Sequence, residues 1–204
     1  MMKSIFLILL KKEFIEFMQN KKFWSFVVFV IAATVAIFFT KRNLPDQVYL
    51  ILIVMLVSQY VFDSCYNDIK SGGALFFLNI KCSTLHIIAA KAVYAVIIGS
   101  GLFLTAEFFL LKDSIYADLI WLIPLFCFIT GLTYNSAVLT KKSDLLTSLL
   151  TSAITLGVLQ ILSFGISLFL RFIILFFFAC VTIFFASKLS KTIKYRAEVS
   201  SLKK

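Results

Sequence analysis

The chain contains little charge, little glycine or proline, few cysteines and a single histidine. Of its 204 residues, 15% are charged, seven are Gly, two are Pro and four are Cys. Because soluble domains carry about 25% charged residues, an ordinary cytosolic globular domain is excluded. The low Gly and Pro content excludes collagen-like and low-complexity chains. Disorder is excluded as well, since disordered chains combine low hydrophobicity with high charge.

The scarcity of reactive side chains also excludes most kinds of catalytic site. A zinc site needs three or four ligands, which His86 and four scattered cysteines do not supply. Glu107 is the only carboxylate clearly inside an apolar run, so an intramembrane aspartyl protease lacks its second carboxylate. No G-x-x-x-x-G-K-[ST] motif for ATP binding occurs. We therefore expect no enzymatic activity, no metal and no cofactor in this chain.

What the sequence has in excess is apolar residues. They make up 61% of the chain, with 24 Phe and a mean hydropathy of +1.02. A helix of about 20 apolar residues crosses a bilayer. Six apolar runs of this kind occur at roughly 23–40, 48–62, 92–111, 119–139, 145–164 and 172–187. The sequence thus predicts an all-α integral membrane protein with six transmembrane helices over residues 23–187, the last two separated by a turn near Gly165 to Arg171.

The distribution of positive charge predicts the orientation in the membrane. There are 20 Lys and Arg against 10 Asp and Glu, a formal charge of +10. Six spans place 16 of the 20 basic residues on one side, including a basic tail at 188–204. Because Lys and Arg concentrate in cytoplasmic loops, we expect both termini on the cytoplasmic side of a bacterial plasma membrane. The charge then serves orientation and attraction to anionic lipids, and no nucleic-acid partner is expected.

The first 22 residues predict an amphipathic helix in the cytoplasmic interface. Apolar residues recur at spacings of three and four, while charged residues fall elsewhere on the helical wheel. The segment therefore fits either a lipid anchor or a protein contact. Its candidate functional residues are Lys12, Glu13, Phe14 and Phe17.

The longest predicted loop, residues 66–91, contains an unusual apolar patch. Asn67 or Asp68 is suited to cap a helix there. Leu75, Phe76 and Leu78 would lie outside the bilayer. Exposed bulky apolar residues on a cytoplasmic loop suggest a protein partner; the alternative is a short helix lying on the lipid surface.

This loop resembles the corresponding loop in permease subunits of ATP-binding-cassette (ABC) transporters of the type-2 exporter class. The family pattern contains an acidic residue, a Gly, apolar positions, a Pro-[Ile/Val]-[Ser/Thr] step and a Lys that opens the third span. Asp replaces the commoner Glu here, Gly73 stands where Thr is usual, and Lys81 occupies the place of the Pro. The N-terminal basic segment and the six-span layout are also similar to this family. The matching residues in the loop are Asp68, Gly72, Leu75, Leu78, Ser83 and Lys91.

The resemblance implies a division of labour between subunits. Two permease chains, identical or related, would form the pathway, and separate ATPase subunits would bind ATP and Mg. The loop would act as a coupling helix that docks on the ATPase, aided by the N-terminal interfacial helix. The docking residues would be Asp68, Gly72, Leu75, Phe76 and Leu78. A lipid-like, peptide or drug-like compound would be exported. The alternative function is a non-transport membrane protein, such as a peptide-toxin immunity or scaffold protein.

Polar residues inside the predicted spans are candidates for a translocation path. Glu107 is an ionisable group within a span, which favours a functional role, although it could also reach the interface and pair there. Ser152 and Thr155 lie on one face of the fifth span. Such small hydroxyl residues either line a path or allow close helix packing.

Overall fold

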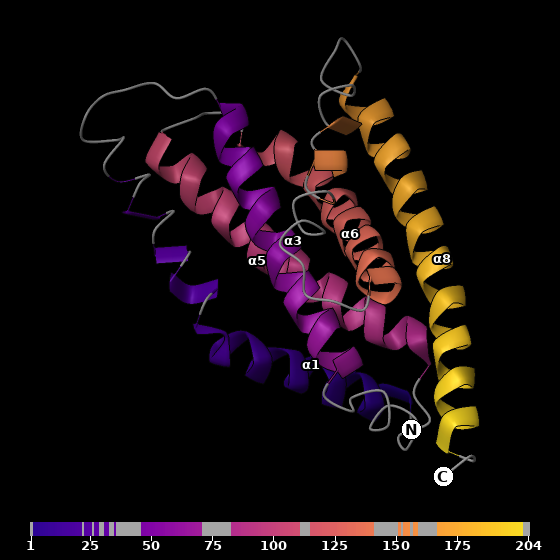
Figure 1. Cartoon of the computed structure of the whole chain (residues 1–204). Helices are drawn as coiled ribbons and strands as arrows, with labels where there is room; N and C mark the ends of the chain where they lie inside the picture. Colours follow the sequence, from indigo (N-terminus) through magenta and orange to yellow (C-terminus); the bar gives the residue numbers. More distant parts are fainter. Residues whose placement is uncertain are drawn as a thin grey trace.

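The structure is a computed structural model that describes residues 2–21, 23–25, 27, 28, 31, 32, 35, 46–70, 83–110, 115–140, 151, 153–155, 157, 158 and 167–201. Over these residues the chain is α-helical and contains no strand, which confirms the all-α prediction. The continuous helices are α1 (Met2–Gln19), α3 (Asp46–Lys70), α5 (Thr84–Leu110), α6 (Ile115–Thr140) and α8 (Leu168–Ser201) (Figure 1).

Three of these helices are long and apolar enough to cross a bilayer. The spanning segments are Thr84–Thr105 in α5, Ile120–Leu139 in α6 and Leu168–Leu189 in α8. Three of the six predicted spans therefore coincide with helices of the required length and apolar character. Helices α5 and α8 begin at Thr84 and Leu168, earlier than the predicted spans, and the residues by which they are extended are mostly apolar as well.

Helix α6 lies at the centre of the bundle and packs against α3, α5 and α8. Two glycines make these contacts close. A Cβ atom on Gly99 of α5 would lie 2.2 Å from Cζ of Phe126, whose side chain is fully buried. A Cβ atom on Gly131 of α6 would lie 2.5 Å from Oγ1 of Thr182 in α8. The absence of a side chain at both positions therefore allows the helices to approach, as is common between membrane helices.

Helices α6 and α8 run in the same direction. Near their N-terminal ends the Arg171 guanidinium lies 5.8 Å from the centroid of the Trp121 ring. One turn or more further along, Asn135 Nδ2 donates a hydrogen bond of 3.0 Å to the Thr182 carbonyl. In Figure 1, α3 also runs in this direction and α5 runs in the opposite one. Because α6 and α8 are parallel, α6 ends at one end of the bundle and α8 begins at the other. The chain between them, residues 141–167, therefore returns along the length of the bundle, which is about 39 Å for a helix as long as α6.

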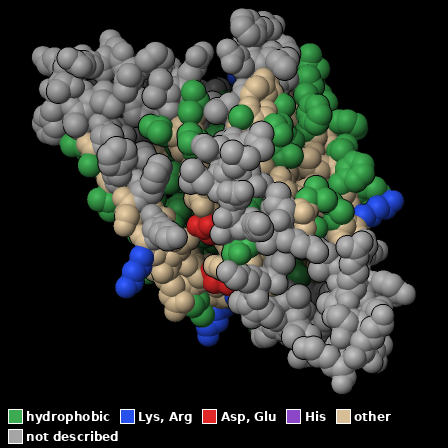
Figure 2. Space-filling model, viewed as in Figure 1, with side chains coloured by type: hydrophobic (Ala, Val, Ile, Leu, Met, Phe, Trp, Pro, Cys, Tyr) green, Lys and Arg blue, Asp and Glu red, His purple; other side chains and the backbone are tan. Residues whose placement is uncertain are grey.

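The outer face of α8 is covered with large apolar side chains. Phe169 is 74% exposed and Phe177 is 64% exposed. Figure 2 shows hydrophobic side chains along this flank of the molecule. Such a surface is suited to lipid acyl chains, because an aqueous surface would not carry so many exposed aromatic residues. The members that are more than half exposed are Phe169, Phe176, Phe177, Phe184 and Phe185.

Helix α1 lies across one end of the bundle, at the end where both chain termini are found (Figure 1). It contacts α5 and α3. Its charged face points toward these helices: Glu13 is 2% exposed. The opposite face is apolar and exposed, with Leu7, Phe14 and Met18. The helix ends at Gln19, and Asn20 Oδ1 then accepts a hydrogen bond of 3.0 Å from the Phe23 amide, as an N-cap residue does.

Candidate functional site

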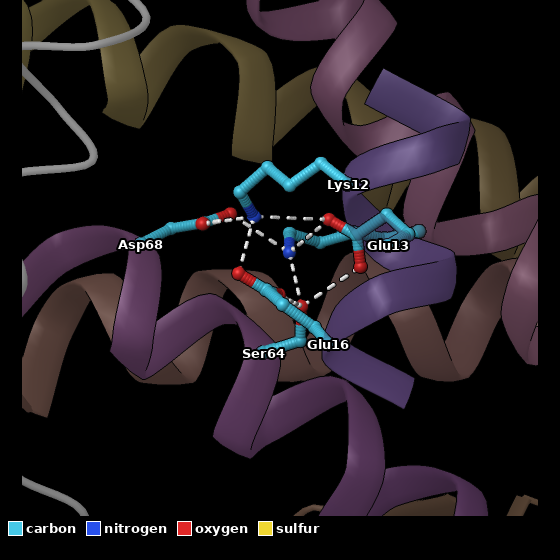
Figure 3. Close-up of polar contacts among 6 residues, drawn as sticks. Lys12, Glu13, Glu16, Ser64 and Asp68 are labelled. Carbon is cyan, nitrogen blue, oxygen red and sulfur yellow. Dashed lines mark hydrogen bonds and ion pairs between the residues drawn. The ribbon is translucent and has the colours of Figure 1, made fainter. Parts of the chain in front are cut away.

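The most distinctive polar feature is a buried network of six side chains from three helices, drawn in Figure 3. Lys12, Glu13 and Glu16 come from α1, where Glu16 lies three residues after Glu13 and four after Lys12, the spacings that share one face of a helix. Ser64 and Asp68 come from α3, and their spacing of four also puts them on one face. Lys91 comes from α5. We call this set the charge network.

Lys91 is the centre of the charge network. Its Nζ atom lies 2.8 Å from Glu13 Oε1 and 2.8 Å from Asp68 Oδ2. It also donates a hydrogen bond to the Ser64 hydroxyl. The side chain is fully buried, and those of Glu13 and Asp68 are 2% and 8% exposed. A buried ammonium group is tolerated only when it is paired and hydrogen-bonded, and here three partners from two other helices satisfy it.

Lys12 is the second cation of the charge network. Its Nζ atom lies 2.5 Å from Asp68 Oδ1 and 2.7 Å from Glu16 Oε1. Burial and the nearby Lys91 ammonium lower the pKa of Lys12. The attraction of Asp68 and Glu13 outweighs both effects, so the pKa lies above its usual value. Asp68 is therefore held between two ammonium groups, one on each carboxylate oxygen.

Ser64 connects the two glutamates. Its hydroxyl lies 2.9 Å from Glu13 Oε2 and 3.1 Å from Glu16 Oε2, and the single proton is donated to one of them at a time. Three carboxylates and two ammonium groups give the charge network a formal charge of −1. The network thus joins α1, α3 and α5 through charged and hydrogen-bonded contacts.

The contact between Ser64 and Lys91 also has the composition of a nucleophile and its general base. Catalysis would require Lys91 to accept the serine proton. Two carboxylates at 2.8 Å hold the lysine in its charged form, which cannot accept one. In the described part of the chain, no group of three or more His, Cys, Asp and Glu side chains is placed to hold a metal ion. The geometry therefore favours positioning of helices over covalent chemistry.

Of the predicted interfacial residues, Lys12 and Glu13 belong to the charge network, and Phe17 belongs to an aromatic cluster. The Phe17 ring lies 5.4 Å from the Phe23 ring and 5.8 Å from the Tyr60 ring, measured between centroids. Phe14 is 51% exposed on the outer face of α1. The predicted interfacial helix thus presents apolar residues outward, and its Lys12 and Glu13 are paired with charged residues of the other helices.

Asp68, which the sequence predicts to cap or dock a loop helix, is part of the charge network in the structure. It lies in the last turns of α3 and is 7% exposed, bonded to both lysines of the charge network. The other predicted docking residues, Gly72, Leu75, Phe76 and Leu78, lie outside the described residues.

The predicted path residues are described only in part. Thr155 is buried, and its hydroxyl donates a hydrogen bond of 2.8 Å to the Thr151 carbonyl one turn earlier. This local bond is typical of a packing residue. Glu107 lies in α5, but its side chain is outside what the structure describes, and Ser152 is not described.

Sequence reasoning missed Glu16 and Ser64 and assigned Lys91 only as the residue that opens a span. One signal was present: Lys91 is the only charged residue between Leu85 and Thr105. A charge placed within an apolar helix predicts a buried partner. The partners, however, lie 27 and 78 residues away in the sequence.

Comparisons with known proteins identify no family. No family model matches the chain. No curated protein matches it significantly in sequence, and no solved structure matches it significantly in fold.

Proposed function

We propose that this chain is the membrane-spanning permease subunit of an ATP-driven exporter of the ABC type-2 class. The observation that carries the proposal is the ion pair of 2.8 Å between Asp68 and Lys91. These residues stand before and after the segment that would dock on the ATPase. The pair closes the base of that segment, and the rest of the charge network fastens the same base to α1. A docking segment with a rigid base is what force transmission from a partner requires.

The layout of the helices supports six spans. The described residues between 21 and 35 and between 151 and 158 are helical, where the first and fifth spans are expected. The parallel packing of α6 and α8 requires the chain to return between them. Both chain ends lie at the end of the bundle that carries α1 (Figure 1). In this proposal that end faces the cytoplasm of a bacterial cell.

The charge network gives this subunit a way to couple ATP use to the pathway. Separate ATPase subunits, which bind ATP and Mg, dock on residues 71–82 from the cytoplasm. Their closure moves the base of that segment, and α1, α3 and α5 follow as one unit because buried ion pairs connect them. The result is a shift in population between inward-open and outward-open states. A second permease chain completes the pathway for a lipid-like, peptide or drug-like substrate.

The test is purification of the native complex in mild detergent, followed by mass spectrometry of its subunits. We expect an ATPase subunit to copurify with the wild-type chain. The double variant Leu75→Asp, Phe76→Asp should lose that subunit and still insert into the membrane. Leu139→Asp is the control, because Leu139 is 69% exposed near the C-terminal end of α6 and is not one of the predicted docking residues. This control should retain the ATPase.

Two outcomes would contradict the proposal. If no ATPase copurifies with the wild-type chain, the non-transport alternative is favoured instead. If the loop variant keeps the ATPase as well as the control does, the docking assignment is wrong.

A further inference from the structure

A polar cavity of about 520 Å³ lies beside the charge network, between the end of α1 and the middle of α3. Its walls include two carboxylate residues, Glu16 and Asp63, together with Tyr60 and Asn67. Figure 2 shows acidic side chains at two nearby places on this face. The volume lies within the range of about 300–1,000 Å³ typical of small-molecule sites.

Tyr60 provides a buried polar group that the protein itself does not satisfy. Its side chain is 1% exposed, and its hydroxyl has no hydrogen-bond partner among the described residues. The ring is fixed by Phe17 and Phe23, at centroid distances of 5.8 and 5.4 Å. A buried hydroxyl without a partner costs about 1–3 kcal/mol. A ligand in the cavity that bonds this hydroxyl would recover that energy.

The carboxylates of the cavity determine the charge of such a ligand. Glu16 already bonds Lys12 and Ser64, and Asp63 Oδ1 accepts a hydrogen bond of 3.0 Å from Gln59 Nε2. A carboxylate offers about four acceptor positions, so each can accept a further donor. Aromatic rings at Tyr60 and Tyr66 also favour a cation. The described side chains provide no metal-binding group, which favours an organic cation over a metal ion.

We propose that this cavity binds a primary ammonium group, which donates hydrogen bonds to Glu16, Asp63 and the Tyr60 hydroxyl oxygen. The ammonium has three donors, which matches these three acceptors. Lys21 is exposed on the same cavity wall and is suited to an anionic group beside the ammonium. The inference concerns a ligand site on this chain and does not depend on the exporter assignment.

The ammonium group has two possible sources, an aminophospholipid headgroup or a free diamine. The surroundings favour the lipid. A second, almost wholly apolar groove of about 430 Å³ is lined by Phe17, Phe23, Trp24 and Tyr94. Phe17 and Phe23 also contact Tyr60, so the aromatic cluster forms the boundary between the polar cavity and the groove. A lipid with its headgroup in the cavity could place an acyl chain in the groove.

The experiment measures thermal unfolding of the purified full chain in detergent with added lipid or amine. The probes are phosphatidylethanolamine, phosphatidylcholine, phosphatidylglycerol and 1,4-diaminobutane. We expect phosphatidylethanolamine to raise Tm in a saturable manner. Phosphatidylcholine, whose quaternary ammonium has no N–H donor, should bind at least about tenfold more weakly. A tenfold difference in affinity corresponds to about 1.4 kcal/mol. Phosphatidylglycerol has no amine and should behave likewise.

Two variants tie the effect to this cavity. Tyr60→Phe removes a buried hydroxyl that has no partner among the described residues, so we expect the unliganded protein to unfold at the wild-type Tm or above it, and to bind phosphatidylethanolamine about tenfold more weakly. Asp63→Asn should weaken binding by a similar factor. Tyr134→Phe, a buried tyrosine on α6 outside the cavity, is the matched control and should keep the wild-type affinity.

The outcomes distinguish a lipid headgroup from a free amine, and either of them from failure of the proposal. Stabilisation by phosphatidylethanolamine alone identifies the lipid. Stabilisation by the diamine alone, lost in Tyr60→Phe, identifies a free amine in the same site. No stabilisation by either amine, or full affinity in Tyr60→Phe, would overturn the proposal. None of these results bears on whether an ATPase copurifies.

Discussion

Replacing Lys91 with methionine removes the ammonium group between Glu13 and Asp68 and keeps a side chain of similar length. At an effective dielectric constant of about 20, each contact at 2.8 Å is worth about 6 kcal/mol of Coulomb attraction. Desolvation of the three ions offsets much of this, at several kcal/mol per ion. Removing one member of a buried pair typically costs about 3–5 kcal/mol, because the remaining charges stay buried without compensation. We expect Lys91→Met to lose this amount of stability.

The assay is thermal unfolding of the purified protein in detergent. With about 2–4 °C per kcal/mol for a chain of this size, Tm should fall by about 6–20 °C. Lys11→Met is the matched control, because Lys11 is exposed on α1 and lies outside the charge network. Its stability should change by less than about 0.5 kcal/mol. The same substitution at two lysines thus separates a buried ammonium from an exposed one.

A double variant tests the reason for the loss. Asp68→Asn combined with Lys91→Met removes one negative and one positive charge, so the network keeps its net charge of −1. We expect the double variant to be more stable than the sum of the single losses predicts, by about 0.5–3 kcal/mol. If the two effects add, or if Lys91→Met unfolds at the same temperature as Lys11→Met, then the ion pairs do not hold the helices together.

Two further predictions concern packing and orientation. Gly99→Ala should destabilise the protein by about 1–3 kcal/mol in the same assay, because the new Cβ would clash with the buried Phe126 ring; Gly101→Ala has nothing within 4 Å of its Cβ and should be neutral or stabilising by up to about 1 kcal/mol. Equal losses at the two glycines would refute close packing of α5 on α6. Epitope tags at both ends of the chain should resist protease added to the outside of intact cells, and cleavage of one tag alone would contradict an even number of spans.

The helical fold follows from the sequence to a large extent, for a simple reason. Apolar runs of about 20 residues are visible without any knowledge of neighbours, and three of those predicted coincide with helices long and apolar enough to cross a membrane. The ends of the helices were harder to predict. Helix α8 continues beyond its apolar run to Ser201 because polar residues with good helix propensity follow it.

The charge network could be predicted only in part. The amphipathic character of α1 indicated that Lys12 and Glu13 share a polar face, but an amphipathic helix at a membrane normally turns that face to water. Here the polar face of α1 turns toward Lys91. Burying the Lys91 ammonium without charged partners would cost more free energy than removing the α1 carboxylates from water. Pairing across 78 residues depends on the tertiary fold, which a single sequence does not reveal.

The inward charges of α1 have a consequence for the order in which the protein is assembled. Glu13 is synthesised 78 residues before Lys91. At about 5–20 residues per second, about 4–16 s pass before its partner leaves the ribosome. During that interval the carboxylates and Lys12 must stay hydrated, so α1 cannot settle in its final position. Although α1 emerges before the other continuous helices that the structure describes, it becomes fixed only after Lys91 of α5 has been synthesised, and it completes this end of the molecule.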